Sequence, residues 1–288
     1  MPVRSILITG STGQLGNSLK QIECMFPGYE FIYTSRENFP LDNAQKMQDV
    51  FASVQPDYCI NCAAYTAVDK AESEKELAFK INAEAVGEIA KLCLTYHTRL
   101  IHISTDYVFD GNSVSSYSEE DLTNPLNVYG ASKAEGEKLA LIHNPDTIII
   151  RTSWVFSEYG KNFVKTMISL MHTREEINVV NDQHGSPTYA LDLATAIMKL
   201  IQNNRWIPGI YHYCNTGQTT WFEFANAIKE MISSNCRILP IPTSAYPTPA
   251  RRPKNSLLNK TKICNTYGLQ IRDWKIALRE CINKLQTG

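Results

Sequence analysis

The chain has 288 residues, of which 28 are lysine or arginine and 29 are aspartate or glutamate, so its formal net charge is −1. With 43% hydrophobic and 20% charged residues, the composition excludes a disordered, collagen-like or disulfide-stapled chain. The length allows one large domain or two unequal ones. Because the charge is balanced, no overall field draws the chain onto nucleic acid or an anionic membrane, and we expect neither partner.

Targeting segments are not evident in the sequence. The apolar run at residues 5–8 ends too early for a signal peptide, and no later run approaches the roughly 20 residues of a membrane span. We therefore expect a cytoplasmic protein whose eight cysteines are reduced. Cys59 and Cys62 have CxxC spacing but lie in an apolar run without a second pair, which favours a buried strand over a redox or metal site.

Short apolar runs alternate with amphipathic stretches in the N-terminal half. We expect strands at 5–9, 29–34, 57–64, 99–104 and 147–153, and helices at 15–22, 77–92 and 129–141. Strands this apolar are typical of parallel sheets that helices cover on both faces. The pattern predicts an α/β fold, a Rossmann-type doubly wound parallel sheet.

After Ser153 the alternation of apolar runs and amphipathic stretches becomes less regular and the connections become longer. Seven of the 13 prolines lie beyond residue 186. We therefore expect a smaller α/β substrate-binding lobe. The predicted division is a dinucleotide-binding domain at 1–152, rejoined by about 187–204, and a mainly sugar-nucleotide substrate domain at 153–288. A helix at 192–201 would return to the first domain.

A glycine-rich loop, GSTGQLG at residues 10–16, follows the first strand and opens the first helix. Gly10, Gly13 and Gly16 would permit a tight turn and a close approach of the backbone to a pyrophosphate, while the helix N-terminus offers free N–H groups. The spacing is GxxGxxG instead of the commoner GxGxxG. Its position at the first strand-to-helix turn still favours a dinucleotide site.

The end of the second expected strand bears on the choice of nicotinamide cofactor. An acidic residue is expected about 20 residues after the glycines to bind a ribose 2′-hydroxyl, but Ser35 and Arg36 stand there. A hydroxyl and a guanidinium suit a 2′-phosphate, so we expect NADPH. NADH is the alternative, since Glu37 or Asp42 could bind the ribose, and Arg36 could equally lie on a solvated loop.

Tyr129 and Lys133, in the segment YGASK, are four residues apart and share one face of a helix. A phenol with a pKa of about 10 exchanges protons poorly at pH 7, and a neighbouring ammonium would lower that pKa. Thr105 follows an expected strand, so it could converge with Tyr129 on one substrate group. These three candidate catalytic residues predict hydride transfer to a carbonyl; the alternative is an incidental Tyr/Lys pair on a surface helix.

Several segments together resemble one known family. They are GSTGQLG (10–16), NCAAYTAVDKAE (61–72), STDYVFDG (104–111), NVYGASK (127–133), RTSWVF (151–156), VNDQHGSPT (180–188) and TPARRP (248–253). The chain is similar over nearly its whole length to the extended short-chain dehydrogenase/reductases and, within them, to the dTDP-4-dehydrorhamnose reductase family.

The resemblance implies that Tyr129 protonates the substrate oxygen while NADPH delivers hydride to the C4 ketone of dTDP-4-dehydro-β-L-rhamnose, giving dTDP-β-L-rhamnose. It implies that Lys133 binds the nicotinamide ribose and that Thr105 hydrogen-bonds the reacting oxygen. It further implies cofactor contacts at Gly13, Gln14, Leu15, Ala63, Ala64 and Tyr65, and sugar-nucleotide contacts at Asp106, Trp154, Arg251 and Arg252. A plain core position for Trp154 and solvated positions for the two arginines are the alternatives.

The chain also departs from the family pattern. Some members bridge a dimer with Mg²⁺ through glutamates, one of them in the first helix, where this chain has Asn17 and Ser18. Hard oxygen ligands are equally scarce in ALDL at 190–193. We therefore predict no metal, and a homodimer stays open.

Other functions share these motifs. A sugar-nucleotide dehydratase needs a second carboxylate after Asp106, where Tyr107 stands, and an epimerase would keep its NAD bound through the cycle. A non-catalytic regulatory subunit of the methionine adenosyltransferase type would keep the fold, yet Thr105, Tyr129 and Lys133 are all present here. A reductase is therefore favoured over another sugar-nucleotide enzyme or a regulatory subunit.

Overall fold

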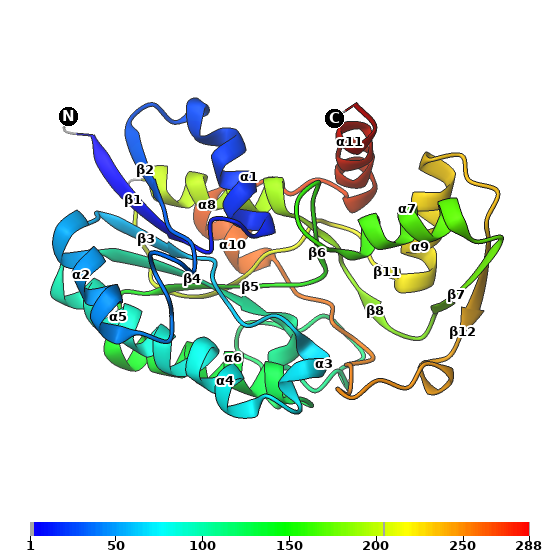
Figure 1. Cartoon of the computed structure of the whole chain (residues 1–288), viewed down its shortest axis with the longest axis horizontal. Helices are drawn as coiled ribbons and strands as arrows, with labels where there is room; N and C mark the ends of the chain where they lie inside the picture. The colour runs from blue at the N-terminus through cyan, green and yellow to red at the C-terminus, as the bar shows by residue number, and fades with distance from the viewer. Residues whose placement is uncertain (1–2, 204, 288) are drawn as a thin grey trace.

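The computed structural model describes residues 3–203 and 205–287. A six-stranded sheet lies at its centre with the strand order β10-β5-β4-β3-β1-β2, and every neighbouring pair is parallel (Figure 1). This confirms the predicted doubly wound sheet. The strands are β1 (Arg4–Thr9), β2 (Tyr29–Tyr33), β3 (Tyr58–Asn61), β4 (Arg99–Thr105), β5 (Ile148–Thr152), β6 (Val155–Phe156), β7 (Glu176–Val180), β8 (His184–Gly185), β9 (Thr188–Tyr189), β10 (Gly209–His212), β11 (Thr219–Thr220) and β12 (Arg237–Ile241).

Helices cover both faces of this sheet, because successive strand residues point to opposite sides. Ile6 and Ile8 pack in a buried cluster with α1, α8 and α10, whereas Leu7 packs in a second cluster with α2, α5 and α6. Each such buried side chain stabilises the fold by about 1.5–3 kcal/mol. The helices are α1 (Gln14–Ile22), α2 (Ala44–Val54), α3 (Val68–Ala71), α4 (Lys75–Phe79), α5 (Ala85–Thr95), α6 (Val128–His143), α7 (Phe163–Thr173), α8 (Ala190–Gln202), α9 (Trp221–Met231), α10 (Thr261–Tyr267) and α11 (Trp274–Thr287), with the short turns η1 (Glu23–Met25), η2 (Lys80–Glu84), η3 (Asp106–Val108) and η4 (Thr243–Ala245).

The long helix expected at 77–92 is interrupted by η2, which is a single π-helical turn. The apolar positions step by four residues from Leu77 to Ile81 and then by five to Val86. A regular α-helix would turn Val86 away from that face, and the wider π turn absorbs the extra residue. The helical stretch therefore runs as α4, η2 and α5.

The π turn also fixes the position of α6. The Asn82 side chain accepts a hydrogen bond from Tyr65 N (2.8 Å) and donates to Tyr65 O and to Ser132 Oγ (3.0 Å each). A Cβ atom at Gly136 of α6 would overlap the carbonyl oxygen of Asn82, so the two helices approach at backbone distance. Asn82 thus joins α6 to the loop after β3.

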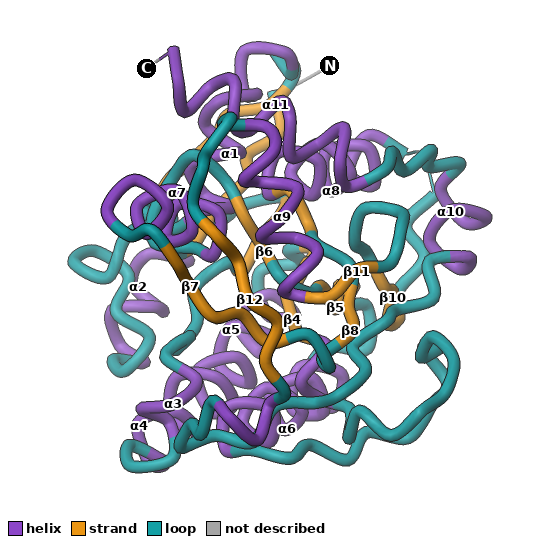
Figure 2. Tube along the Cα trace, turned by 90° about the vertical axis from the view of Figure 1, so that its right-hand side faces the viewer, coloured by secondary structure: helices purple, strands orange, loops and turns teal. Residues whose placement is uncertain are grey.

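The chain beyond residue 153 contributes to two parts of the structure: a second, smaller core and the central sheet. β7 and β12 form a parallel pair next to α7 and α9 (Figure 2), and with α11 they share a core that includes Phe224, Ile228 and Trp274. In contrast, α8 packs with α1 against the central sheet, and β10 adds that sheet's sixth strand. The sequence did not predict β10, whose apolar run is short and follows Pro208. The domain boundaries stay a prediction.

Cys59 and Cys62 are both free thiols, and Cys59 is buried in β3, as its apolar run predicted. Burial raises the pKa of the Cys62 thiol, which disfavours the reactive thiolate. Within the described residues, no group of three or more His, Cys, Asp or Glu side chains is placed to hold a metal ion. No helix in residues 3–203 and 205–287 is both long and apolar enough to cross a membrane.

The contact between Gly136 and Asn82 yields a test of the packing of α6. We predict that Gly136→Ala lowers the free energy of unfolding by about 1–3 kcal/mol, because the added methyl group must displace backbone. Gly87→Ala in α5 is the matched control, since its Cβ would meet only the side chains of His143 and Leu139 at 3.3 Å. Urea unfolding of both variants measures the difference; equal stabilities would contradict the proposed close contact.

Candidate active site

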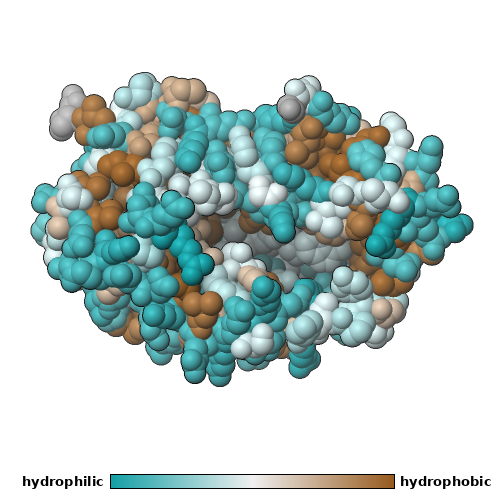
Figure 3. Space-filling view, in the orientation of Figure 1, coloured by the Kyte–Doolittle hydropathy of each residue, from teal (hydrophilic) through white to brown (hydrophobic). Residues whose placement is uncertain are grey.

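A cavity of about 970 Å³ opens at the carboxyl ends of β1, β3, β4 and β5, where ligands bind in open α/β sheets. Figure 3 shows the molecule hollowed near the middle of this face. The sheet order places the crevice where β2 and β3 leave β1 in opposite directions. Fifteen of the residues predicted for the site line the cavity: Gly10, Gly13, Gln14, Leu15, Ser35, Arg36, Asp42, Ala63, Ala64, Tyr65, Thr105, Asp106, Tyr129, Lys133 and Trp154.

The glycine loop forms one end of the cavity. Gly10 has a φ of +66°, and a Cβ there would lie 2.8 Å from the backbone of Ala63. Gly16 does not line the cavity, but a Cβ there would lie 2.5 Å from Ser11 Cα, so it permits the tight turn. Gly13 caps α1 without any side-chain hydrogen bond, which leaves the positive end of the helix for an anion. These features fit the pyrophosphate of a dinucleotide.

Ser35, Arg36 and Asp42 line the same end of the cavity. Ser35 begins a tight loop in which its N–H donates to Asn38 Oδ1 (2.7 Å) and its Oγ accepts from Glu37 N (3.3 Å). Arg36 is exposed, so its guanidinium is free to swing over a ligand. This loop lies beyond β2, at the distance along the chain where an adenine ribose is recognised in dinucleotide folds.

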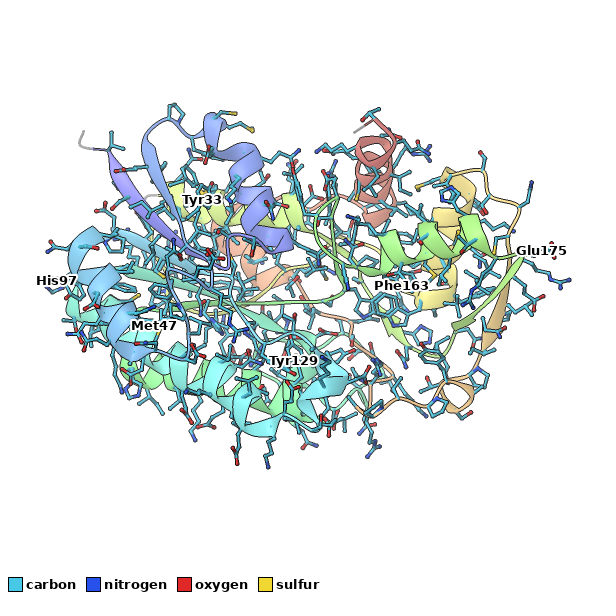
Figure 4. The ribbon with its side chains drawn as sticks, in the orientation of Figure 1. Tyr33, Met47, His97, Tyr129, Phe163 and Glu175 are labelled. Carbon is cyan, nitrogen blue, oxygen red and sulfur yellow. The ribbon has the colours of Figure 1, made fainter. Side chains whose placement is uncertain are left out.

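Tyr129 and Lys133 project from the first turns of α6 toward β4, and Figure 4 places Tyr129 near the middle of the molecule. The helix begins at Asn127, whose side chain accepts from Gly130 N (2.8 Å). A Cβ at Gly130 would overlap the carbonyl oxygen of Tyr107, so the start of α6 sits directly on η3. This contact brings Tyr129 to Thr105 at the end of β4.

Burial raises the pKa of Tyr129 to about 12, although a hydrogen bond with Thr105 lowers it in part. The sequence predicted that Lys133 would lower this pKa. Instead, Lys133 Nζ donates to Ile103 O (2.7 Å) and lies 3.2 Å from His102 Nε2. Burial lowers the pKa of Lys133 to about 8. At pH 7 Tyr129 is therefore a protonated phenol, which suits a proton donor.

Asp106 is buried beside the catalytic candidates. Its Oδ1 accepts from Thr105 Oγ1 (3.0 Å), while its Oδ2 has no hydrogen-bond partner among the described residues. Burial raises the pKa of this carboxyl to about 6. An orphaned buried oxygen in the cavity wall is suited to a hydroxyl group of a ligand.

Part of the cavity wall is aromatic. Trp154 follows β5 with a φ of +49°, and its ring stacks on Trp221 of α9 with 3.6 Å between ring centroids. A Cβ at Gly185 would lie 2.5 Å from the Trp154 ring, so the glycine makes room for it. Trp221 also lines the cavity but was not predicted, since nothing in the sequence near residue 221 resembles a binding motif.

Arg251 and Arg252 do not line this cavity. Arg251 is exposed, and Arg252 forms an ion pair with Asp69 of α3 through Nη2 and Oδ2 (2.8 Å). Asn127 Nδ2 donates to Arg251 O (2.8 Å), so the segment TPARRP is anchored beside the start of α6. Diphosphate binding by the two arginines stays a prediction that these contacts do not test.

A family model described as the RmlD substrate binding domain matches residues 4–287. The chain is 40% identical to the dTDP-4-dehydrorhamnose reductase of Aggregatibacter actinomycetemcomitans over 95% of this chain and 97% of that one. A solved structure of dTDP-4-dehydrorhamnose reductase from Bacillus anthracis in complex with NADP is 39% identical, with a TM-score of 0.94 over 99% of this chain and 100% of that one. UDP-glucose 4-epimerase of Thermus thermophilus shares only the fold, with 18% identity and a TM-score of 0.83 over 98% and 99% of the chains. The chain belongs to the family described as the RmlD substrate binding domain.

Proposed function

We propose that this protein is an NADPH-dependent dTDP-4-dehydrorhamnose reductase, which reduces the C4 ketone of dTDP-4-dehydro-β-L-rhamnose to dTDP-β-L-rhamnose. The observation that carries this proposal is the convergence of Tyr129, Lys133 and Thr105 on one cavity that the glycine loop also lines. Full-length relatives named for that activity, one of them solved with NADP, support it. NADPH, when bound, supplies the hydride.

Tyr129 donates the proton in this mechanism. Reduction turns a ketone oxygen into an alkoxide, and that charge needs hydrogen-bond donors already aimed at it. Burial keeps Tyr129 protonated at neutral pH. The Thr105 hydroxyl, whose single proton goes to Asp106 Oδ1 in the structure, becomes the second donor when it turns to the substrate oxygen. Tyr129 becomes a tyrosinate when it gives up its proton. Lys133, one helical turn away on the same face of α6, is the residue that binds the nicotinamide ribose in this proposal.

The remaining residues bind and orient the ligands. Gly10 and Gly13 leave room for a pyrophosphate against the N-terminus of α1, and Arg36 is suited to a 2′-phosphate. The stacked Trp154 and Trp221 offer an apolar wall to a deoxysugar. Asp106 Oδ2 is available to a sugar hydroxyl. The sugar nucleotide is thus the small-molecule partner.

A dehydratase is disfavoured by the residue that follows Asp106. The structure places the ring of Tyr107 against Tyr129 in an edge-to-face arrangement, with 5.8 Å between centroids, where a dehydratase would need a second carboxylate. The neighbouring epimerase shares the fold at 18% identity, which carries no argument about chemistry.

Tyr129→Phe tests the proton donor. We expect kcat for NADPH oxidation with dTDP-4-dehydrorhamnose to fall by about 10²–10⁴-fold, because the ring stays while its proton is lost. Tyr33→Phe is the control, since it removes a buried hydroxyl of β2 that lies outside the cavity. No turnover by the wild type would overturn the proposed function; wild-type kcat in Tyr129→Phe would overturn the role of the phenol alone.

Arg36→Ala tests the choice of cofactor. We expect the ratio of kcat/KM for NADPH to that for NADH to fall by about 10–100-fold, since one charge-assisted hydrogen bond to the 2′-phosphate is lost. Arg174→Ala, at another exposed arginine that does not line the cavity, should leave the ratio unchanged. A ratio that is the same in Arg36→Ala and the wild type would contradict the assignment.

Asp106→Asn tests how the raised pKa of the buried carboxyl affects the free energy of unfolding. The raised pKa means that the folded protein keeps a proton between pH 3.8 and about 6 that the unfolded chain releases, so stability falls as pH rises through this window. We expect the asparagine variant to gain about 3 kcal/mol relative to wild type above pH 6 and nothing near pH 3. Urea unfolding across this pH range measures the gain; a gain independent of pH would contradict the cause.

A further inference from the structure

A row of buried polar side chains crosses the central sheet beneath the cavity. Thr9 of β1 is the registered neighbour of Asn61 of β3, and Asn61 is the registered neighbour of His102 of β4. All three are at most 1% exposed, and their neighbours on the same face, Leu7, Cys59 and Leu100, are buried apolar residues. Their shared register puts them on one face of the sheet, the face that α6 covers.

Hydrogen bonds join this row to the amine of Lys133. Thr9 Oγ1 and Asn61 Oδ1 are 2.6 Å apart, and Asn61 Nδ2 lies 3.0 Å from His102 Nδ1. His102 Nε2 then lies 3.2 Å from Lys133 Nζ, which also donates to Ile103 O. A buried histidine seldom occupies an apolar strand without a role for both ring nitrogens. The mechanism above does not use it.

The proton positions along the row are coupled to the charge of Lys133. If the Asn61 amide donates to His102 Nδ1, the neutral ring carries its proton on Nε2 and faces a neutral amine. If the amide is turned, its oxygen accepts from Nδ1–H, and Nε2 becomes an acceptor for the ammonium. Because burial and Lys133 lower the pKa of His102 well below 6.5, the ring is neutral in both arrangements. The tautomer of His102 therefore follows the charge of Lys133: the proton is on Nε2 beside a neutral amine and on Nδ1 beside an ammonium.

We propose that His102, held by Asn61 and Thr9, is a positioning residue that anchors the Lys133 amine and stabilises its ammonium form. A buried ammonium needs acceptors for its N–H groups. Ile103 O provides one, and His102 Nε2 provides a second in the arrangement in which the Asn61 oxygen faces Nδ1–H. The third N–H is left for a ligand in the cavity. The catalytic meaning of this anchor rests on the proposed function, but the anchor itself does not.

Other groups also act on the Lys133 amine. Glu137, one turn later on α6, favours the ammonium, although it is paired with Arg151 of β5 (2.7 Å). Cys62, after β3, also favours it, and Tyr129 lies one turn earlier on the same helix. None of these is within hydrogen-bond distance of Nζ among the described contacts, so His102 is the side chain in direct contact.

The test measures the titration of Lys133 directly. In protein labelled with ¹³C-lysine, the Cε signal of Lys133 is identified by its loss in Lys133→Met. We expect His102→Leu to lower the Lys133 midpoint by about one pH unit or more, since the ammonium loses an acceptor. His102→Gln, whose amide oxygen can take the place of Nε2, should restore most of that shift. Asn61→Asp should raise the midpoint, because it fixes the proton of His102 on Nδ1.

His212→Leu is the matched control, since His212 is a histidine of β10 that is equally buried and bonded to Tyr117 O (3.2 Å). It should lower the melting temperature without moving the midpoint. An unchanged midpoint in a folded His102→Leu overturns the proposal. If that variant does not fold, Asn61→Asp decides when it is compared in the wild-type and His102→Gln backgrounds. A larger rise in the background that keeps His102 supports the proposal, and an equal rise in both, which the added charge alone would give, overturns it.

Kinetics then connect the anchor to the reaction. As pH rises, we expect kcat of His102→Leu to fall at a lower pH than kcat of the wild type. The difference in pH should equal the shift of the Lys133 midpoint, and KM for the sugar nucleotide should be unchanged. Because the titration needs neither cofactor nor substrate, it remains readable if the wild type proves inactive on dTDP-4-dehydrorhamnose. If the proposed function is wrong, the wild type shows no turnover; if the anchor is wrong, the Lys133 midpoint does not move. The two results are therefore distinguishable.

Discussion

The site depends on how closely α6 approaches the sheet and its neighbouring helices. Gly130 and Gly136 rest on the carbonyl oxygens of Tyr107 and Asn82, where any larger residue would overlap the backbone. Helix axes normally lie about 8–10 Å apart because side chains separate them. Two glycines remove that separation here, so the side chain of Lys133 reaches the interior of the strand layer. Without this approach, Tyr129 and Lys133 would not reach Thr105 and Ile103 of β4.

The proposed function requires a nearly neutral chain to bind two anionic ligands. The positive end of α1, the guanidinium of Arg36 and the amine of Lys133 are the positive groups that face the cavity. Elsewhere, charge is neutralised locally, as in the buried pair of Arg151 and Glu137 and the pair of Arg252 and Asp69. Under the proposed function, phosphate is therefore bound in a pocket and not on a basic surface.

The sequence predicted much of this arrangement because its signals are local. The strand runs, the glycine loop and the spacing of Tyr129 and Lys133 depend on residues close together in the chain. Strands form within those runs, and Gly10, Gly13, Tyr129 and Lys133 line the cavity, while their roles stay a prediction. Trp221 and β10 were missed because only long-range packing brings them to Trp154 and β5. The raised pKa of Tyr129 was missed as well, since burial is a property of the whole fold. The row formed by Thr9, Asn61 and His102 becomes visible only once the strand register is known.

The π turn at Lys80–Glu84 has a consequence for how this chain can change over evolutionary time. A π turn is equivalent to an α-helix that has gained one residue. Deleting one residue there would restore regular helical hydrogen bonding, and the segment alone would gain local stability. The deletion would also rotate everything on one side by about 100°, the angle of one helical residue. The Asn82 side chain would then lose its hydrogen bonds with Tyr65 and Ser132, and α6 would lose the contact that positions it. Single-residue length changes in this surface helix are therefore expected to be selected against as strongly as substitutions in the cavity itself.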